Sequence, residues 1–226
     1  SSIGALFYRA HWMSGNLHFI DDLIRGLEAQ DLNVLPVFSF SLKHNPEEEG
    51  EGSRTLTEYM LNPDGTSRVD CIVNTMGLAM SDLSQEGATI ASGWSVDFLD
   101  KMDVPVIQGV VSTGTRQEWE ESSLGLGPID TAMNVALPEF DGRIISVPIS
   151  FKEETASGHN GSMVSNRLQR YVAQPDRIDL LARLAAKWAN LRRKTNAEKR
   201  VAIIMSNYPT KDARIGNAVG LDTPAS

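Results

Sequence analysis

The stretch "IGALFYRAHWMSGNLHFIDDLIRGLEAQDLNVLPVFSF", residues Ile3–Phe40, places a helical pattern between two apolar runs. The runs, Ile3–Tyr8 and Asn33–Phe40, have the length of buried strands. Between them, apolar residues recur at the spacing of one helix face: Leu17, Ile20, Leu23, Ile24 and Leu27. Asn16 is the predicted N-cap of this helix. A strand, a helix and a strand within roughly 35 residues predict a βαβ unit with parallel strands.

Further apolar runs extend this pattern along the chain. We predict strands at Val69–Gly77, Val104–Val111, Arg143–Phe151 and Arg200–Pro209, and a long amphipathic helix that begins near Pro175. The predicted fold class is α/β, with a mostly parallel, doubly wound sheet of Rossmann-like or flavodoxin-like type and flanking helices. We predict an α/β domain with βαβ units over residues 1–151. Residues 152–226 then hold a connecting loop, the long helix, the last strand and the start of a further element.

The composition excludes several classes of protein. The 226 residues carry a formal net charge of -8, which disfavours duplex nucleic acid as the main partner. No apolar run reaches the roughly 20 residues that cross a bilayer, and the N-terminal stretch lacks the pattern of a signal peptide. Cys71 is the only cysteine, so neither an intrachain disulfide nor a zinc cluster of thiolates can form. We therefore expect a cytoplasmic protein that binds no nucleic acid and no membrane.

Ligands of open parallel sheets bind beyond the carboxyl ends of the strands, and this rule selects four polar loops. The loops are Arg9–Asn16, Asn74–Ser81, Ser112–Ser122 and Asn207–Asn217. His11 in the first loop is either a surface or hydrogen-bonded histidine, or a metal ligand or proton carrier, since imidazole titrates near neutral pH. In the third loop, Arg116 and Glu118 either begin a solvated helix or face a cavity.

The segment "NVALPEFDGR", Asn134–Arg143, combines a turn signal with a carboxylate that a turn does not need. Pro138 disfavours helical backbone at Leu137, so we predict that the preceding helix stops there. Asp141–Gly142 is an ordinary turn signal. Glu139 is then either an incidental acidic side chain or a group that holds a divalent metal or accepts a proton.

Four long motifs resemble those of a known family. They are "LFYRAHWMSGNLHFIDDLIRGLEAQDLNVLPVF", "PVIQGVVSTGTRQEWEESSLGL", "NVALPEFDGRI" and "NYPTKDARIGNAVGLDTPAS", and they follow one another over nearly the whole chain. The series resembles the large subunit of cobaltochelatase, a family related to the porphyrin-binding H subunit of magnesium chelatase. The "YRAHW" motif with His11 and the "GLDTPAS" ending look more like the cobalt branch.

The resemblance implies ATP-dependent insertion of Co(II), the substrate metal, into a corrin or porphyrin-type tetrapyrrole in cobalamin biosynthesis. It also implies that AAA+ ATPase partner subunits use the ATP. This agrees with the absence from the sequence of a GxGxxG fingerprint and of a Walker lysine motif. In the magnesium branch, the glutamate of the matching "ALPELDG" motif is thought to lie in the active-site cavity.

The residue of this chain that matches that glutamate is Glu139. We hypothesise that Glu139 is the catalytic base or a metal ligand and that His11 is an auxiliary metal ligand. Substrate contacts are expected from the charged residues Arg9, Arg116 and Glu118. Phe140 stands where the magnesium branch has leucine, which is a mild change.

Two other functions stay open. Because family members are much longer than 226 residues, we expect a piece of a longer protein, inactive by itself. Such a piece could be a non-catalytic module that binds tetrapyrrole or docks the ATPase subunits. A small-ligand α/β domain like those of periplasmic binding proteins or glycosyltransferases is a further alternative, which only the generic sheet pattern supports.

Overall fold

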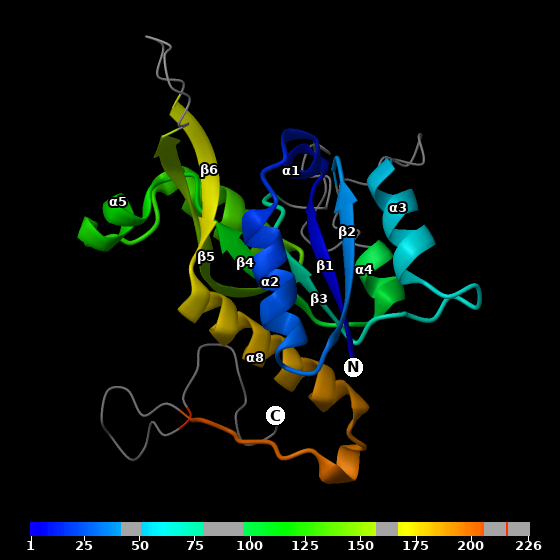
Figure 1. Cartoon of the computed structure of the whole chain (residues 1–226). Coiled ribbons are helices and arrows are strands. Elements are labelled where there is room, and N and C mark those ends of the chain that lie inside the picture. Colours follow the sequence, from blue (N-terminus) through cyan, green and yellow to red (C-terminus); the bar gives the residue numbers. More distant parts are fainter. Residues whose placement is uncertain (42–50, 79–96, 157–166, 206–215, 217–226) are drawn as a thin grey trace, which may run out of the picture. The chain divides into compact units, whose positions relative to one another are not determined.

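The computed structural model of the chain describes residues 1–41, 51–78, 97–156, 167–205 and 216 (Figure 1). The chain divides into two compact units, Ser1–Arg193 and Lys194–Ser226. The first unit contains a six-stranded sheet with helices on both faces. Within the described ranges, every helix is too short or too polar to cross a membrane.

The sheet combines five parallel strands with one antiparallel strand. The strands are β1 (Ser2–Tyr8), β2 (Asn33–Ser39), β3 (Cys71–Asn74), β4 (Val106–Val111), β5 (Ile144–Ala156) and β6 (Arg167–Ala173). Their order is β2-β1-β3-β4-β5-β6, and only the β5–β6 pair is antiparallel. The order 2-1-3-4-5 is flavodoxin-like and reverses between β1 and β3. The predicted fold class is therefore confirmed.

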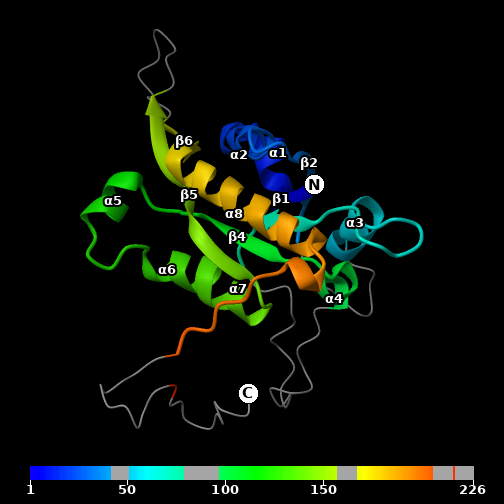
Figure 2. The ribbon, with the colours of Figure 1, turned by 90° about the horizontal axis from the view of Figure 1, so that it is seen from below.

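Helices cover both faces of the sheet. The helices of the first unit are α1 (Arg9–Ser14), α2 (His18–Glu28), α3 (Glu51–Met60), α4 (Asp97–Met102), α5 (Arg116–Glu121), α6 (Pro128–Thr131), the π-helix η1 (Ala132–Ala136), α7 (Leu137–Phe140) and α8 (Pro175–Arg193). The second unit contains the 3-10 helix η2 (Asn196–Glu198). The core contacts place α2 and α8 on one face and α3 and α4 on the other. Figure 2 shows α6 and α7 on the side of the sheet opposite to α8.

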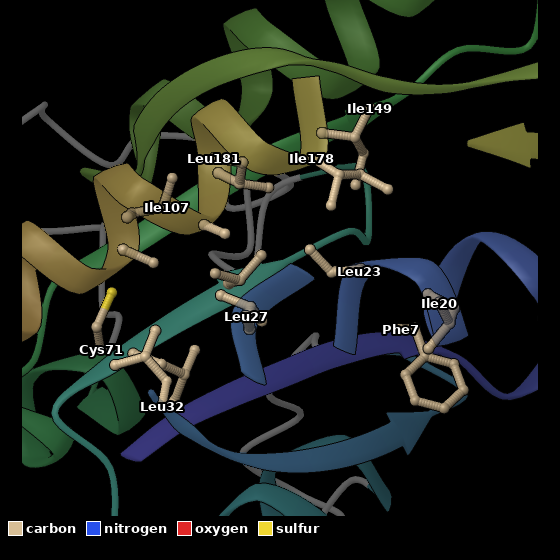
Figure 3. Close-up of a cluster of buried hydrophobic side chains, with 14 of the residues drawn as sticks. Phe7, Ile20, Leu23, Leu27, Leu32, Cys71, Ile107, Ile149, Ile178 and Leu181 are labelled. Atoms are coloured by element: carbon tan, nitrogen blue, oxygen red, sulfur yellow. The ribbon is translucent and has the colours of Figure 1, made fainter. Parts of the chain in front are cut away.

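The face beneath α2 and α8 is apolar (Figure 3). Alternate strand residues such as Phe7 and Ile107 point towards Leu23 of α2 and Leu181 of α8. The two helices approach closely where Gly26 faces Ile178, because a Cβ at Gly26 would lie 2.5 Å from the Ile178 Cγ2 atom. Glycine is therefore required at this contact.

Cys71 belongs to the same apolar cluster. Its side chain is fully buried. Burial is the main cause that raises the pKa of the thiol to about 12. The cysteine is therefore an inert core residue at neutral pH, because the reactive form of a thiol is the thiolate.

The first unit extends to Arg193, beyond the domain boundary predicted at residue 151. The physical reason is that β5 continues to Ala156 and pairs with β6, a strand that was not predicted. The following helix α8 then packs on the sheet through Leu181 and its neighbours. The last predicted strand is not formed at Arg200–Met205, whose backbone has no regular structure. Its remainder lies outside the described residues.

The prediction that Asn16 caps α2 is wrong. The N-cap position is Leu17, and Asn16 Oδ1 instead accepts a hydrogen bond from Tyr171 N of β6 at 3.1 Å. Since β6 is at the far edge of the sheet from β2, this bond shows that the sheet curls towards α2. Figure 1 shows β6 beside the N-terminal end of α2.

Candidate functional site

The strand order reverses between β1 and β3, so their carboxyl ends are the expected place for a ligand. β1 ends at Tyr8, which leads into α1, and β3 ends at Asn74, which leads into the segment Thr75–Leu78. Tyr8 Oη donates a hydrogen bond to Gly77 O at 3.0 Å and so joins the two strand ends. Burial raises the pKa of Tyr8, while the charge of Arg143 opposes the shift.

A polar seam, made of Asn74, Gln108, Asp141 and Arg143, is buried on the sheet face that carries α3 and α4. Asn74 and Gln108 are register partners in β3 and β4, and side-chain alternation turns both to this face. Asn74 Nδ2 donates to Gln108 Oε1 at 2.7 Å and to Met76 O at 2.8 Å. Gln108 Nε2 also donates to Met76 O, at 3.1 Å. The two amides thus fix the start of the loop after β3.

An ion pair completes the seam. Arg143 Nη2 lies 2.6 Å from Asp141 Oδ2, and both side chains are fully buried. Arg143 Nη1 donates to Met76 O at 3.1 Å and to Gln108 Oε1 at 3.0 Å. Arg143 Nη2 also donates to Leu78 O at 3.0 Å. Burial lowers the pKa of Arg143, and the charge of Asp141 opposes this shift. Asp141 is therefore more than the turn residue that the sequence indicated.

The helical segment before Asp141 runs through Pro138, so the predicted stop at Leu137 is wrong. The π-helix η1 ends at Ala136, and Pro138 falls in the first turn of α7, where its missing N–H needs no intrahelical partner. The wider π turn therefore lets the chain continue helically past a proline. The predicted turn at Asp141–Gly142 is confirmed, since Gly142 has φ +71°.

Glu139 lies in α7, next to the polar seam but outside it. Its side chain is exposed and makes no hydrogen bond or ion pair with any residue that the structure describes. Two contacts tie its segment to the loop after β3: Leu78 N donates to Met133 O at 2.7 Å, and Arg143 reaches Leu78 O. A carboxylate open to solvent is thus held on a backbone that these hydrogen bonds fix in place.

His11 lies in α1 within a cage of aromatic rings. Its ring centroid is 5.0 Å from that of Phe19, 5.3 Å from that of Tyr171 and 6.3 Å from that of Tyr8. Burial lowers the pKa of His11, which favours the neutral imidazole near neutral pH. The neutral ring is the form that binds metals.

Arg9 lies beside exposed aromatic rings at the carboxyl ends of β1 and β2. Its guanidinium carbon is 5.5 Å from the centroid of the Phe40 ring. Trp12, on the same helix, stacks on Phe38 with a centroid distance of 5.7 Å and an interplanar angle of 18°. We call Arg9, Trp12, Phe38 and Phe40 the aromatic edge.

Arg116 and Glu118 begin α5, and both are engaged by protein groups. The carboxylate of Glu118 accepts from Thr115 N at 2.8 Å and from Thr115 Oγ1 at 3.0 Å, as in a capping box. These bonds lower the pKa of Glu118. Arg116 pairs with Glu120 at 2.7 Å and donates to Gln174 Oε1 at 2.7 Å. The contacts are those of a helix start.

A pocket of about 410 Å³ opens at the carboxyl end of β4. Its buried carboxylate is Asp130, which accepts from Ser112 Oγ at 2.6 Å, from Thr113 N at 2.9 Å and from Thr113 Oγ1 at 2.8 Å. Glu118 and Trp119 also line it. The pocket thus contains one of the predicted site residues and one carboxylate that sequence reasoning missed.

The structure does not gather the predicted site residues into one cluster. Arg9 and His11 share α1, Arg116 and Glu118 share α5, and Glu139 is on α7. Among the described residues, no three His, Cys, Asp or Glu side chains form a group that could hold a metal ion. Of the fourth predicted loop, only Gly216 is among the described residues.

The polar seam was not predicted from the sequence, although two of its residues could have indicated it. Asn74 and Gln108 each interrupt the apolar run of a predicted buried strand, and a buried amide must find partners. Arg143 gives no such signal, because it opens a predicted strand directly after a turn. Its burial depends on the loop after β3, which is distant in sequence.

An open, doubly wound sheet with this strand order defines an α/β domain of the flavodoxin-like class. Comparison with known proteins then gives the family. The family model described as CobN/Magnesium Chelatase matches residues 1–226, and the chain belongs to this family.

The chain is similar to several members over almost its whole length. It is 41% identical to the aerobic cobaltochelatase subunit CobN of Pseudomonas aeruginosa, covering 99% of this chain and 16% of that protein. It is 30% identical to the chloroplastic magnesium-chelatase subunit ChlH of Oryza sativa subsp. indica, covering 97% of this chain and 14% of that protein. The chain therefore spans only about a seventh to a sixth of the length of these relatives.

A solved structure agrees with this relationship. The catalytic subunit of cobaltochelatase from Mycobacterium tuberculosis matches with a TM-score of 0.78 and 38% sequence identity. The match covers 100% of this chain and 17% of that chain.

Proposed function

We propose that this chain is part of the large subunit of a cobaltochelatase-type enzyme, which inserts Co(II) into a corrin precursor during cobalamin biosynthesis in the cytoplasm. The relatives named as cobaltochelatase subunits support the reaction. The observation in the structure that carries the proposal is Glu139, an exposed carboxylate without a partner among the described residues, on a segment fixed by the polar seam.

The chemistry of metal insertion needs such a group. Two pyrrole N–H protons must leave the macrocycle while a strongly hydrated cation loses water. The carboxylate of Glu139 takes a proton as a general base, or holds the incoming cation through oxygen and passes it on. Its exposure suits both roles because a proton or hydrated cation can reach it directly.

The remaining predicted residues take supporting roles in this proposal. His11 is the auxiliary ligand, and its burial supports this role by favouring the neutral imidazole. Arg9, Arg116 and Glu118 contact the tetrapyrrole substituents. For Arg116 and Glu118 this requires that the substrate replace the present partners Glu120 and Thr115.

We further propose that ATP is used by AAA+ partner subunits. The sequence offers no phosphate-binding fingerprint of its own, because it lacks both GxGxxG and the Walker lysine motif. Energy from ATP would then reach the metal site through contacts between subunits. The tetrapyrrole and Co(II) are substrates of the proposed reaction.

The test is Glu139→Gln in the assembled chelatase, which removes the charge and keeps the shape. We expect a loss of roughly 100-fold or more in the rate of cobalt insertion, as for the removal of a general base. Tetrapyrrole affinity should change less than threefold. Glu28→Gln, at an exposed position of α2, is the matched control and should keep the wild-type rate. Normal turnover of the Glu139→Gln enzyme would overturn the assignment.

A second candidate is a docking module without catalytic residues. It would dock through Val201, Ile203 and Ile204, apolar residues of the second unit that form no regular secondary structure. Under this alternative, charge substitutions at these three positions would abolish the assembly of subunits, and Glu139→Gln would leave the insertion rate unchanged.

A further inference from the structure

The aromatic edge is an unusual surface for a folded domain. Trp12 is 58% exposed, Phe40 is 66% exposed and Phe38 is 37% exposed. Large apolar side chains that gather at one exposed place indicate a binding site. The edge lies at the carboxyl ends of β1 and β2, where α1 follows β1, and so belongs to the ligand-binding side of the sheet (Figure 1).

Two rings of the aromatic edge, those of Phe38 and Trp12, are held in place by neighbouring aromatic rings. Phe38 packs edge-on against the buried Phe7, with ring centroids 6.0 Å apart, and Trp12 stacks almost parallel on Phe38. Trp12 therefore presents a flat indole face whose orientation is fixed before any ligand arrives. A surface of this kind favours flat, conjugated ligands, because offset stacking takes place between two flat rings. Binding also costs little here, because the Trp12 side chain is already ordered.

Arg9 adds a positive charge to the flat surface. Its guanidinium lies over the Phe40 ring, in the arrangement of a cation–π contact. A guanidinium can bind a carboxylate with two parallel hydrogen bonds while it remains stacked on an aromatic ring. In a chain with a net charge of -8, a carboxylated ligand needs such a local cation.

We propose that the aromatic edge is a stacking site for the plane of a carboxylated tetrapyrrole, with Trp12 and Phe40 against the macrocycle and Arg9 on a peripheral carboxylate. This inference rests on the proposed function in taking the tetrapyrrole as the ligand class and Arg9 as a contact to its substituents. Trp12 directly follows His11 in α1, so a macrocycle stacked on Trp12 lies beside the helix that carries the proposed auxiliary ligand.

The test uses a dicarboxylate free-base porphyrin, deuteroporphyrin IX, as the probe. Binding is followed by the shift of the porphyrin absorption band, because energy transfer would quench every tryptophan and could not identify the stacked one. We expect Trp12→Ala and Phe40→Ala each to weaken binding about tenfold or more, as for the loss of a stacking platform. Trp12→Phe should stay within about threefold of the wild type, since it keeps an aromatic plane.

A matched control separates stacking from general exposure of aromatic rings. Tyr59 on α3 is 48% exposed and outside the edge, so Tyr59→Ala should bind the probe as the wild type does. Arg9→Gln should weaken binding of the dicarboxylate and have less effect on its dimethyl ester. Circular dichroism and thermal unfolding of each variant check that the fold is kept.

The stacking site and the proposed function would be overturned by different results. Wild-type affinity of Trp12→Ala and Phe40→Ala, equal losses with Tyr59→Ala, or no binding by the wild type would each overturn the stacking site. The proposed function fails separately, by normal cobalt insertion in Glu139→Gln. A porphyrin that binds through Trp12 to a chain whose Glu139 is dispensable would keep the stacking site and reject the catalytic assignment.

Discussion

The two faces of the sheet are stabilised in different ways. Beneath α2 and α8 the buried cluster is apolar throughout, with residues such as Leu23, Ile107 and Leu181 (Figure 3). On the opposite face, the apolar contacts with α3 and α4 lie beside the polar seam, which contains Asn74 and Arg143. Apolar packing tolerates the exchange of similar shapes, whereas a buried polar network needs every partner.

The difference assigns separate tasks to the two faces. The apolar face supplies free energy without fixing any loop, because the hydrophobic effect has no direction. The polar seam ends on the carbonyls of Met76 and Leu78, so its hydrogen bonds fix the loop after β3 and the segment that carries Glu139. Changes on the apolar face should therefore affect stability alone, whereas changes in the polar seam should affect both stability and the placement of the candidate site.

The largest effect is expected at the polar seam. Arg143→Met breaks the buried ion pair with Asp141 and removes hydrogen bonds to Met76 and Leu78. The free energy of unfolding should fall by about 3–5 kcal/mol, as measured by urea denaturation. Combining Arg143→Met with Asp141→Leu should restore part of this loss, since the double variant buries neither charge of the ion pair. A double variant no more stable than the single one would contradict the role of the ion pair.

A somewhat smaller effect is expected on the apolar face. Leu181→Ala opens a cavity between α8 and the sheet, where the side chain is fully buried, and should lower the free energy of unfolding by about 3 kcal/mol. Leu180→Ala, on the same helix but 47% exposed, is the control and should change it by less than about 1 kcal/mol. If the two variants were equally stable, α8 would not cover the sheet as described. Leu181→Ala should leave metal and porphyrin binding unchanged, because Leu181 belongs neither to the polar seam nor to the aromatic edge.

The smallest effect concerns pH and His11, whose ring packs against Phe19 of the apolar cluster. Because burial lowers the pKa of His11, the unfolded chain binds the proton more readily than the folded chain. The contribution of His11 is therefore fully present above its unfolded pKa of about 6.5 and is lost as the pH falls towards the folded value. His11→Phe, which keeps a ring in the cage, should flatten the decline of stability between about pH 7 and pH 5. His18→Phe, at an exposed position of α2, is the control. If it flattened the decline of stability as much as His11→Phe does, the decline could not be attributed to His11.

The parts of the fold that could be predicted from the sequence are those with local causes. The unit β1–α2–β2 and the helix α8 carry their own apolar periodicity, so the residues that form each element also indicate it. The strand β6 was missed because its segment "RLQRYVA" interrupts its apolar residues with arginine and glutamine. It becomes a strand through pairing with the extension of β5.

The parts that could not be predicted have distant causes. Asn16 has the chemistry of an N-cap, but its oxygen accepts from the backbone of Tyr171, which is 155 residues away. Asp141 carries a valid turn signal, yet only the tertiary structure brings Arg143 and the loop carbonyls around it into a buried network. Glu139 was singled out because the turn did not explain it. The structure adds that its side chain is exposed and its backbone fixed.

The burial of Cys71 has a practical consequence for spectroscopy. With its thiol fully buried and its pKa raised to about 12, the single native cysteine will not react with maleimide reagents at neutral pH. A thiol introduced by Ser14→Cys on α1 or by Tyr59→Cys on α3 would then be the only site of labelling. Fluorophores at these two positions would report, by their quenching, where on the surface a porphyrin binds, with the aromatic edge left intact.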